Sequence, residues 1–203
     1  MKIYDISQEV FSCAVFPGDP APEKKTLLSL GQGDACNLTA FSMCAHNGTH
    51  VDAPLHFLKD APAVQEIPLK KTVGYAFVAD FSGTLSATDA TAILARAKAQ
   101  HPDAARRILI KGKSVVSREA AEVFAAAGVW LIGNESQTVG PEDAPKAVHL
   151  ILLSQQVVLL EGVRLLEVPE GVYFLSAAPL ALAGAEGAPV RAVLVDFEAE
   201  KPF

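Results

Sequence analysis

The hydrophobic pattern of the first part of the chain is that of extended structure. Apolar and polar positions alternate over residues 2–7, and runs of apolar, β-branched and aromatic residues follow at 26–30 and 38–44. Short runs of this kind are typical of strands. A longer apolar run at 73–81, which the turn signal Ser82-Gly83 ends, predicts a further strand.

From residue 86 onward the pattern predicts helices alternating with strands. Residues 86–100 are rich in alanine at helical spacing, and Ser86 with Asp89 resembles a capping box. Further helices are predicted at 117–127, with Ser117 as N-cap, and at 147–155. The remaining strands are predicted at 107–111, 129–132, 157–160, 172–175 and 190–197. The alternation predicts an α/β fold, and the strand-rich start predicts that its central sheet is mixed.

Composition narrows the class of protein. The 203 residues fit one domain spanning 1–203, and half of them are apolar, as in ordinary folded proteins. The net charge of −6, with no Lys/Arg run among aromatics, argues against a nucleic-acid partner. No signal-peptide pattern opens the sequence, and the apolar run at 157–160 is too short to cross a bilayer. We therefore expect a cytoplasmic protein with no membrane partner.

The cysteines offer no disulfide framework. They are Cys13, Cys36 and Cys44, an odd number without the close spacing of a CxxC metal site. Buried, reduced thiols are the expected state of all three.

A cluster of histidines is the first indication of a metal-binding site. Three of the five histidines, His46, His50 and His56, lie within eleven residues, with Asp52 among them. Imidazole and carboxylate are the usual protein ligands of zinc and manganese. A flat strand would separate His46 from His50 by roughly 13 Å, at about 3.3 Å per residue, and one ion could not bind both.

The segment is therefore predicted to bend. A helix would also bring the two histidines together, but Gly48 and the nearby Pro54 disfavour one. Gly48 can instead supply the backbone freedom of a bend, and Pro54 can stiffen the chain after it.

Two other residues, His149 and Glu161, are ambiguous from the sequence alone. His149 begins an apolar stretch, so it is either a core histidine or a ligand. Glu161 ends a predicted buried strand, where a carboxylate is either exposed to solvent or functional. His101 follows a helix in isolation and is expected to be a solvated loop residue.

The histidine cluster resembles a known signature. His-x-Gly-Thr-His-x-Asp-x-Pro-x-His, at residues 46–56, is similar to the motif of the metal-dependent cyclase family, which includes bacterial kynurenine formamidases and isatin hydrolases. The turn at residues 16–19, Phe-Pro-Gly-Asp, also resembles this family. Further short segments that resemble the family follow in the same order, at 161–162, 168–171, 179–184 and 188–194. The resemblance therefore covers nearly the whole chain.

The resemblance implies a metal centre and a fold. His46, His50 and Asp52 would hold one divalent ion, Zn²⁺ or Mn²⁺. Asp52 would bridge to a second ion, held also by His149 and Glu161, so that each subunit would contain one or two ions. The implied fold is an α/β domain of the swivelling β/β/α type, with a mixed sheet and flanking helices.

The resemblance also implies a reaction. His56 would donate and accept protons, and Phe16 would lie against an aromatic substrate ring. The implied activity is hydrolysis of a small-molecule amide, the arylformamidase conversion of N-formylkynurenine to kynurenine and formate in tryptophan catabolism. The implied assembly is a homodimer or larger homo-oligomer, in which subunits can contribute to each other's pockets.

Three different functions stay possible from the sequence. A related hydrolase could act on a cyclic amide, as isatin hydrolase does, or on a carbamate. Two departures favour it: formamidases usually place tryptophan at Phe16, and the segment 111–117 is shorter than in typical relatives; both are expected to shape the substrate pocket. The second possibility is a metal-binding protein without activity, and the third is a purely structural domain.

Overall fold

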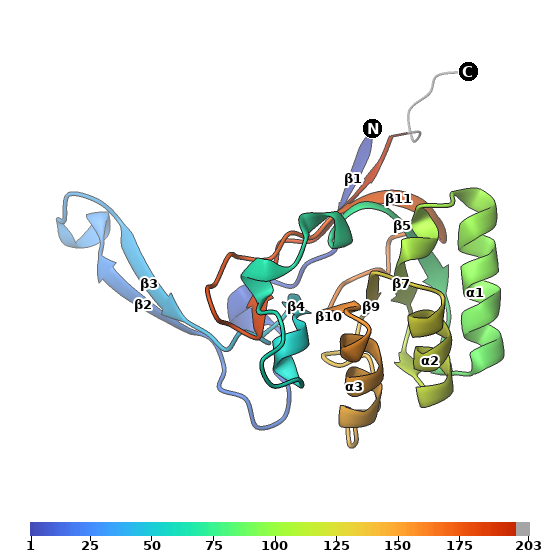
Figure 1. The fold of residues 1–203 in the computed structure, drawn as a ribbon. Helices are drawn as coiled ribbons and strands as arrows, with labels where there is room; N and C mark the ends of the chain where they lie inside the picture. The colour runs from blue at the N-terminus through green and yellow to red at the C-terminus, as the bar shows by residue number, and fades with distance from the viewer. Residues whose placement is uncertain (198–203) are drawn as a thin grey trace.

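The computed structural model describes residues 1–197, which form a mixed nine-stranded sheet covered by three helices (Figure 1). Its parallel centre consists of β5 (Val73–Asp80), β7 (Arg107–Lys111), β9 (Leu131–Asn134) and β10 (Val158–Glu161). Antiparallel strands extend one side: β11 (Gly171–Ser176), β13 (Val193–Asp196) and β1 (Lys2–Asp5). The other side is extended by β4 (His50–Asp52) and β12 (Gly187–Pro189). The helices are α1 (Ala87–Gln100), α2 (Arg118–Ala126) and α3 (Lys146–Ser154).

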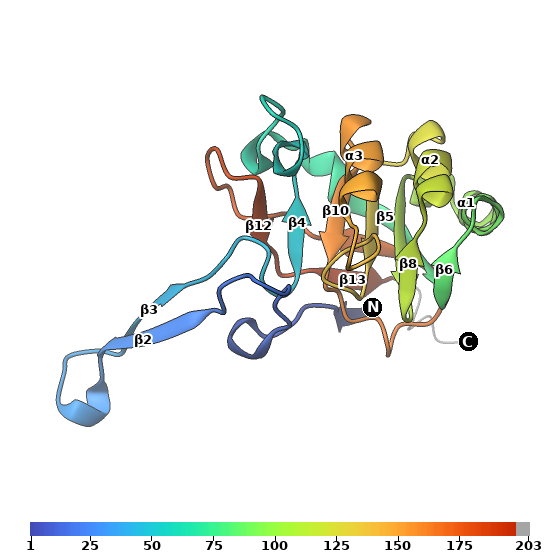
Figure 2. The same ribbon diagram turned by 90° about the horizontal axis from the view of Figure 1, so that it is seen from below.

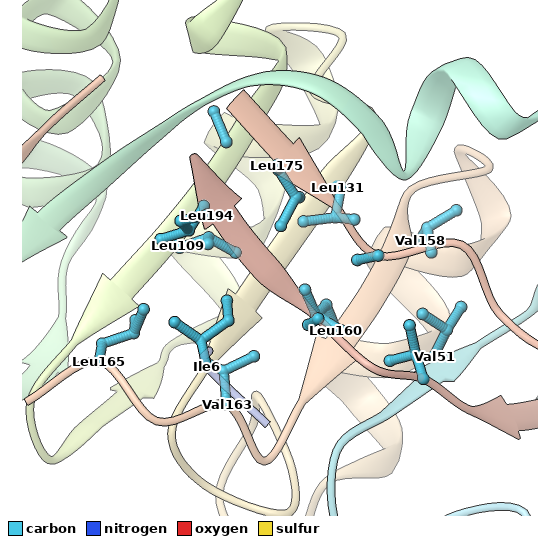
Figure 3. Close-up of a cluster of buried hydrophobic side chains, with 14 of the residues drawn as sticks. Ile6, Val51, Leu109, Leu131, Val158, Leu160, Val163, Leu165, Leu175 and Leu194 are labelled. Carbon is cyan, nitrogen blue, oxygen red and sulfur yellow. The ribbon is translucent and has the colours of Figure 1, made fainter. Parts of the chain in front are cut away.

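Alternate residues of the central strands face two separate cores, because successive side chains of a strand point to opposite faces. In β7, Ile108 and Ile110 pack with the helices, whereas Leu109 belongs to the core on the other face. The sheet curls around that second core, so that Leu175 and Leu194 of the antiparallel strands lie close to Leu109 (Figure 3). The antiparallel strands β11 and β13 therefore share one core with the parallel centre of the sheet.

A two-stranded hairpin projects from the body of the molecule. It is formed by β2 (Glu23–Leu28) and β3 (Leu38–Ser42), which pair antiparallel, and both views show it extending away from the sheet (Figures 1 and 2). All but one of the residues in its strands are exposed. We call residues 23–42 the hairpin arm. A second small pair, β6 (Gly83–Leu85) and β8 (Ser114–Val116), is parallel.

The predicted α/β class, with a mixed sheet and flanking helices, is confirmed. The capping box of Ser86 and Asp89 forms as predicted, and β7 has the predicted bounds. The sequence pattern places the strand at 129–132 two residues too early, since β9 spans Leu131–Asn134. It misses β4, β6, β8 and β12, because strands of three residues are too short to show a period.

Two expectations about single residues are wrong. Cys36 is exposed and Cys13 and Cys44 are half-buried, although all three are free as predicted. Cys36 lies in the loop that joins the strands of the hairpin arm, which has no core around it. His101 is half-buried, and its ring lies 4.2 Å from the ring of Tyr75, so it is not a solvated loop residue. None of the helices within residues 1–197 has the length and apolar character needed to cross a bilayer.

The buried guanidinium of Arg107 ties the start of β7 to the loop before β5. Arg107 is 4% exposed and donates hydrogen bonds to the carbonyl oxygens of Lys71 at 3.1 Å, Val73 at 3.0 Å and Tyr75 at 2.9 Å, and also to that of Lys70. Gly74 permits this close approach, because a Cβ there would lie 2.7 Å from a guanidinium nitrogen. Four carbonyl groups therefore depend on one side chain.

Replacing this side chain should destabilise the fold. Arg107→Met keeps much of the aliphatic volume but leaves four partly buried carbonyl groups without this donor, and we expect the free energy of unfolding to fall by about 2 kcal/mol or more. Urea unfolding followed by the fluorescence of Trp130, the only tryptophan, measures the loss. Arg118→Met, at an exposed position of α2, is the matched control. Equal midpoints for the two variants would contradict this role.

Candidate metal centre

The histidine-rich segment bends twice around a short strand. β4, the middle of this segment, contains only His50–Asp52. The first bend is at Gly48, which has a φ of 65°, and a short 3-10 turn at Pro54–His56 makes the second. A Cβ at Gly48 would lie 2.9 Å from that of Cys13, so both conformation and space require glycine there. The predicted bend is confirmed.

Strand pairing and one helix bring the distant residues to this segment. β4 is antiparallel to β10, and the register places His50 opposite Glu161. His149 is in the first turn of α3, which lies beside β10 (Figure 2), and its Nε2 is 3.3 Å from Glu161 Oε1. His149 and Glu161, whose roles are ambiguous in the sequence, thus lie beside the histidine motif.

Asp52 is the centre of the cluster. Its carboxylate is fully buried and lies within 4 Å of four imidazoles. Oδ1 is 2.8 Å from His46 Nδ1 and 3.4 Å from His50 Nε2. Oδ2 is 3.6 Å from His149 Nε2 and 3.9 Å from His56 Nε2.

Glu161 forms the second acidic position. Its Oε2 lies 3.3 Å from His50 Nε2, and its Oε1 lies 3.3 Å from His149 Nε2 and accepts a hydrogen bond from the backbone of Val139 at 2.8 Å. Glu161 is 2% exposed, so both carboxylates are held inside the protein beside imidazoles.

The donor atoms fit a divalent cation. Within residues 1–197, His50 Nε2 and Asp52 Oδ2 are buried polar atoms without a hydrogen-bond partner, although both are near opposite charges. Leaving such atoms unpaired is costly, and an ion between them would satisfy both. Two sets of ligand atoms lie within 4.8 Å of one another: His46, Asp52 and His56 in one, and His50, Asp52 and Glu161 in the other. Nitrogen and oxygen donors of this kind suit zinc and manganese.

Opposite charges dominate the electrostatics despite burial. Burial opposes the charged form of His50, but the carboxylates of Asp52 and Glu161 raise its pKa to about 10. The same balance raises the pKa of His149 to about 10. Burial alone would raise the pKa of Asp52, but the surrounding imidazoles hold it well below its usual value. The protein therefore keeps Asp52 ionised, as a metal ligand must be.

His56 differs from the other imidazoles of the cluster. Burial lowers its pKa below the usual value, and the charges of His46 and His149 add to this against the attraction of Asp52. Its side chain is 26% exposed, and its ring lies 4.2 Å from that of His46. A neutral imidazole at the edge of the cluster can accept a proton at neutral pH.

A cavity of about 220 Å³ opens onto the cluster. Phe16, which is half-buried, forms part of its wall, as do Asp19 and Thr138. The segment 111–117 lies elsewhere, since Gly112 to Val115 line a separate cavity. The effect of segment 111–117 on the substrate pocket therefore stays a prediction.

Hydrogen bonds from two glutamine side chains hold the chain at Gly48 and Gly162. The sequence pattern does not predict these bonds. Gln137 Nε2 donates to the carbonyl oxygen of Gly48 at 2.9 Å, and Gln8 Nε2 donates to that of Gly162 at 2.8 Å. The two side chains also bond to each other at 2.7 Å. Gly162 must lack a side chain, because a Cβ would lie 2.3 Å from the Gly48 oxygen. Neither glutamine has a characteristic spacing to the motif, so only the fold could identify them.

Comparisons with known proteins show which family the chain resembles over its length. A curated relative from Salinibacter ruber (strain DSM 13855 / M31), named kynurenine formamidase, is 35% identical over 97% of this chain and 98% of its own. A solved structure described as a potential metal-dependent hydrolase with cyclase activity is 28% identical, with a TM-score of 0.79 over 95% of this chain and 96% of its own. Isatin hydrolase A from Labrenzia aggregata, bound to benzyl benzoate, shares the fold, with a TM-score of 0.78 at 21% identity over 95% of this chain and 93% of its own. The family model described as "Putative cyclase" matches residues 4–141, and the chain belongs to this family.

Proposed function

We propose that this protein is a divalent-metal-dependent hydrolase of a non-peptide C–N bond, with an N-formyl arylamine such as N-formylkynurenine as its substrate. The observation that carries the proposal is the buried Asp52 carboxylate, which lies among imidazoles beside a cavity and has an oxygen without a hydrogen-bond partner. The extended similarity to a protein named kynurenine formamidase supports the substrate class.

Asp52 would be shared between two ions. His46 and Asp52 would bind one of them. His149 and Glu161 would bind the other, and His50 is within 3.4 Å of both carboxylates and could bind either. The ligand set suits Zn²⁺ and Mn²⁺ alike. When bound, the ions would supply positive charge that acidifies water and polarises a carbonyl oxygen.

The remaining groups would handle protons and the substrate. His56 Nε2 would accept a proton from the attacking water and return it to the leaving nitrogen, so that formate and a free arylamine result. The lowered pKa of His56 keeps its imidazole neutral for the first of these steps. Phe16 would lie against the aryl ring from the cavity wall.

Isatin hydrolysis is the second candidate. The shared fold of isatin hydrolase A supports it, and so does phenylalanine rather than tryptophan at position 16. Both reactions would use the same ions and the same proton transfer by His56, and they differ in the group that the cavity must hold.

Metal removal and replacement test the proposal directly. We expect the purified protein to hydrolyse N-formylkynurenine faster than isatin, to lose this activity after dialysis against a chelator, and to recover it with Zn²⁺ or Mn²⁺. Product formation measured by absorbance, with metal content measured by elemental analysis, gives the answer. A metal-loaded protein that is inactive on both compounds would refute the proposed function.

The role of His56 separates proton transfer from metal binding. His56→Ala should lower kcat by roughly 100-fold or more, the range for general acid–base catalysis, and should leave the metal content unchanged. His101→Ala, at a cavity lined by Tyr75 and Phe174, is the control and should keep full activity. Loss of metal together with activity in His56→Ala would show that His56 is a ligand instead.

We propose further that the protein is a homodimer held together by the hairpin arm. An isolated two-stranded hairpin has little stability in water. This one nevertheless exposes Leu27, Leu30, Leu38 and Phe41, each by 46% or more. An apolar cavity of about 610 Å³ lies at its base, between Phe41, Phe11 and Leu180. Such exposed apolar surface is typical of a subunit interface, and the arm of a second copy supplies matching apolar side chains.

Charge placed on the arm should break this dimer. Light scattering after gel filtration should give twice the mass of the chain for the unmodified protein, and the mass of one chain for Leu38→Asp. Leu166→Asp places the same charge at a position that is 79% exposed outside the arm, and should remain dimeric. A monomeric unmodified protein, or a dimeric Leu38→Asp variant, would contradict this assembly.

A further inference from the structure

We infer that Glu186 is a positioning residue for His46: its carboxylate accepts the Nε2 hydrogen and thereby directs Nδ1 towards the ion beside Asp52. The inference rests on the metal binding that the proposed function requires, and not on the identity of the substrate. Glu186 Oε1 lies 3.2 Å from His46 Nε2, while Nδ1 of the same ring lies 2.8 Å from Asp52. The ring is thus held between two carboxylates.

The three candidate imidazole ligands share this arrangement but differ in their outer partner. His50 Nδ1 lies 3.0 Å from the carbonyl oxygen of Gly48, and His149 Nδ1 lies 2.9 Å from that of Pro145. In both residues Nε2 faces the carboxylates. His46 is reversed, with Nδ1 facing inward, and its outer partner is the side chain of Glu186. Only this one of the three outer partners can be removed by substitution.

The backbone of Glu186, which directly precedes the edge strand β12, is held beside β4. β12 pairs with β4 so that Gly187 lies opposite Asp52, and the Glu186 carbonyl oxygen accepts a hydrogen bond from Ala53 at 2.8 Å. Gly187 is buried under the imidazole, because a Cβ there would lie 2.8 Å from Cε1 of His46. Gly187 thus packs against the His46 ring, and Glu186 lies at the outer nitrogen of the same ring.

This contact has a chemical consequence for the ion. A carboxylate on the outer nitrogen of a ligating histidine fixes the tautomer and makes the inner nitrogen a stronger donor; loss of such a partner costs about 10- to 100-fold in metal affinity or activity. The Glu186 side chain is 43% exposed, so its removal leaves no buried cavity. Its loss should therefore change metal binding without unfolding the protein.

Titration of the metal-free protein with Zn²⁺ against a chromophoric chelator tests the inference. We expect Glu186→Ala to weaken the affinity of one ion by about 10- to 100-fold, and Glu186→Gln, whose amide oxygen can still accept the Nε2 hydrogen, to weaken it less. The melting temperature of the metal-free variants should match that of the unmodified protein. Glu122→Gln, at an exposed position of α2, is the control for loss of a carboxylate.

The outcomes separate this inference from the proposed function. Unchanged Zn²⁺ affinity in Glu186→Ala would overturn the positioning role and leave the hydrolase proposal intact. Weaker affinity in a protein whose unmodified form is inactive on both amides would support the positioning role and refute the hydrolase. Gly187→Ala provides an independent check, because it displaces the His46 ring and should also weaken Zn²⁺ binding while Glu186 is retained.

Discussion

The structure depends on one buried charge. Asp52 lies in the interior of the sheet, where an isolated carboxylate would be strongly disfavoured, and imidazoles surround it instead of solvent. The imidazoles of His50 and His149 lie near the carboxylates of both Asp52 and Glu161, but His50 Nε2 and Asp52 Oδ2 lack hydrogen-bond partners in the described chain. A divalent ion between these two atoms would pair with both of them and displace the imidazole protons, so its binding would further stabilise the buried carboxylate.

The topology explains how such a cluster can be assembled. β4 has three residues, yet it lies between β10 and β12, and its two neighbours bring Glu161 and Glu186 to either side of the motif. Gly48 and Gly162 allow the chain to turn sharply next to the ligands. The site thus rests on a sheet, and hydrogen bonds from side chains remote in the sequence hold the turns.

The sequence predicts the motif well because its constraint is local. A flat strand would hold His46 and His50 too far apart to share an ion, and Gly48 and Pro54 disfavour a helix, so a bend at Gly48 follows. His149 and Glu161 are different, because their proximity to the motif depends on strand order, which spacing does not encode; the family resemblance alone singles them out. Glu186 and the glutamines have no local signal at all. The same reason explains the missed strands, which are defined by partners and not by periodicity.

X-ray absorption at the zinc edge of the zinc-loaded protein tests the central claim most directly. We predict a first shell of nitrogen and oxygen atoms at about 2.0–2.2 Å, with the outer-shell scattering of imidazole rings, and loss of stoichiometric zinc when Asp52 is replaced by alanine. A shell with sulfur at about 2.3 Å would assign the metal to cysteines, and failure to retain zinc in the unmodified protein would show that the cluster binds none.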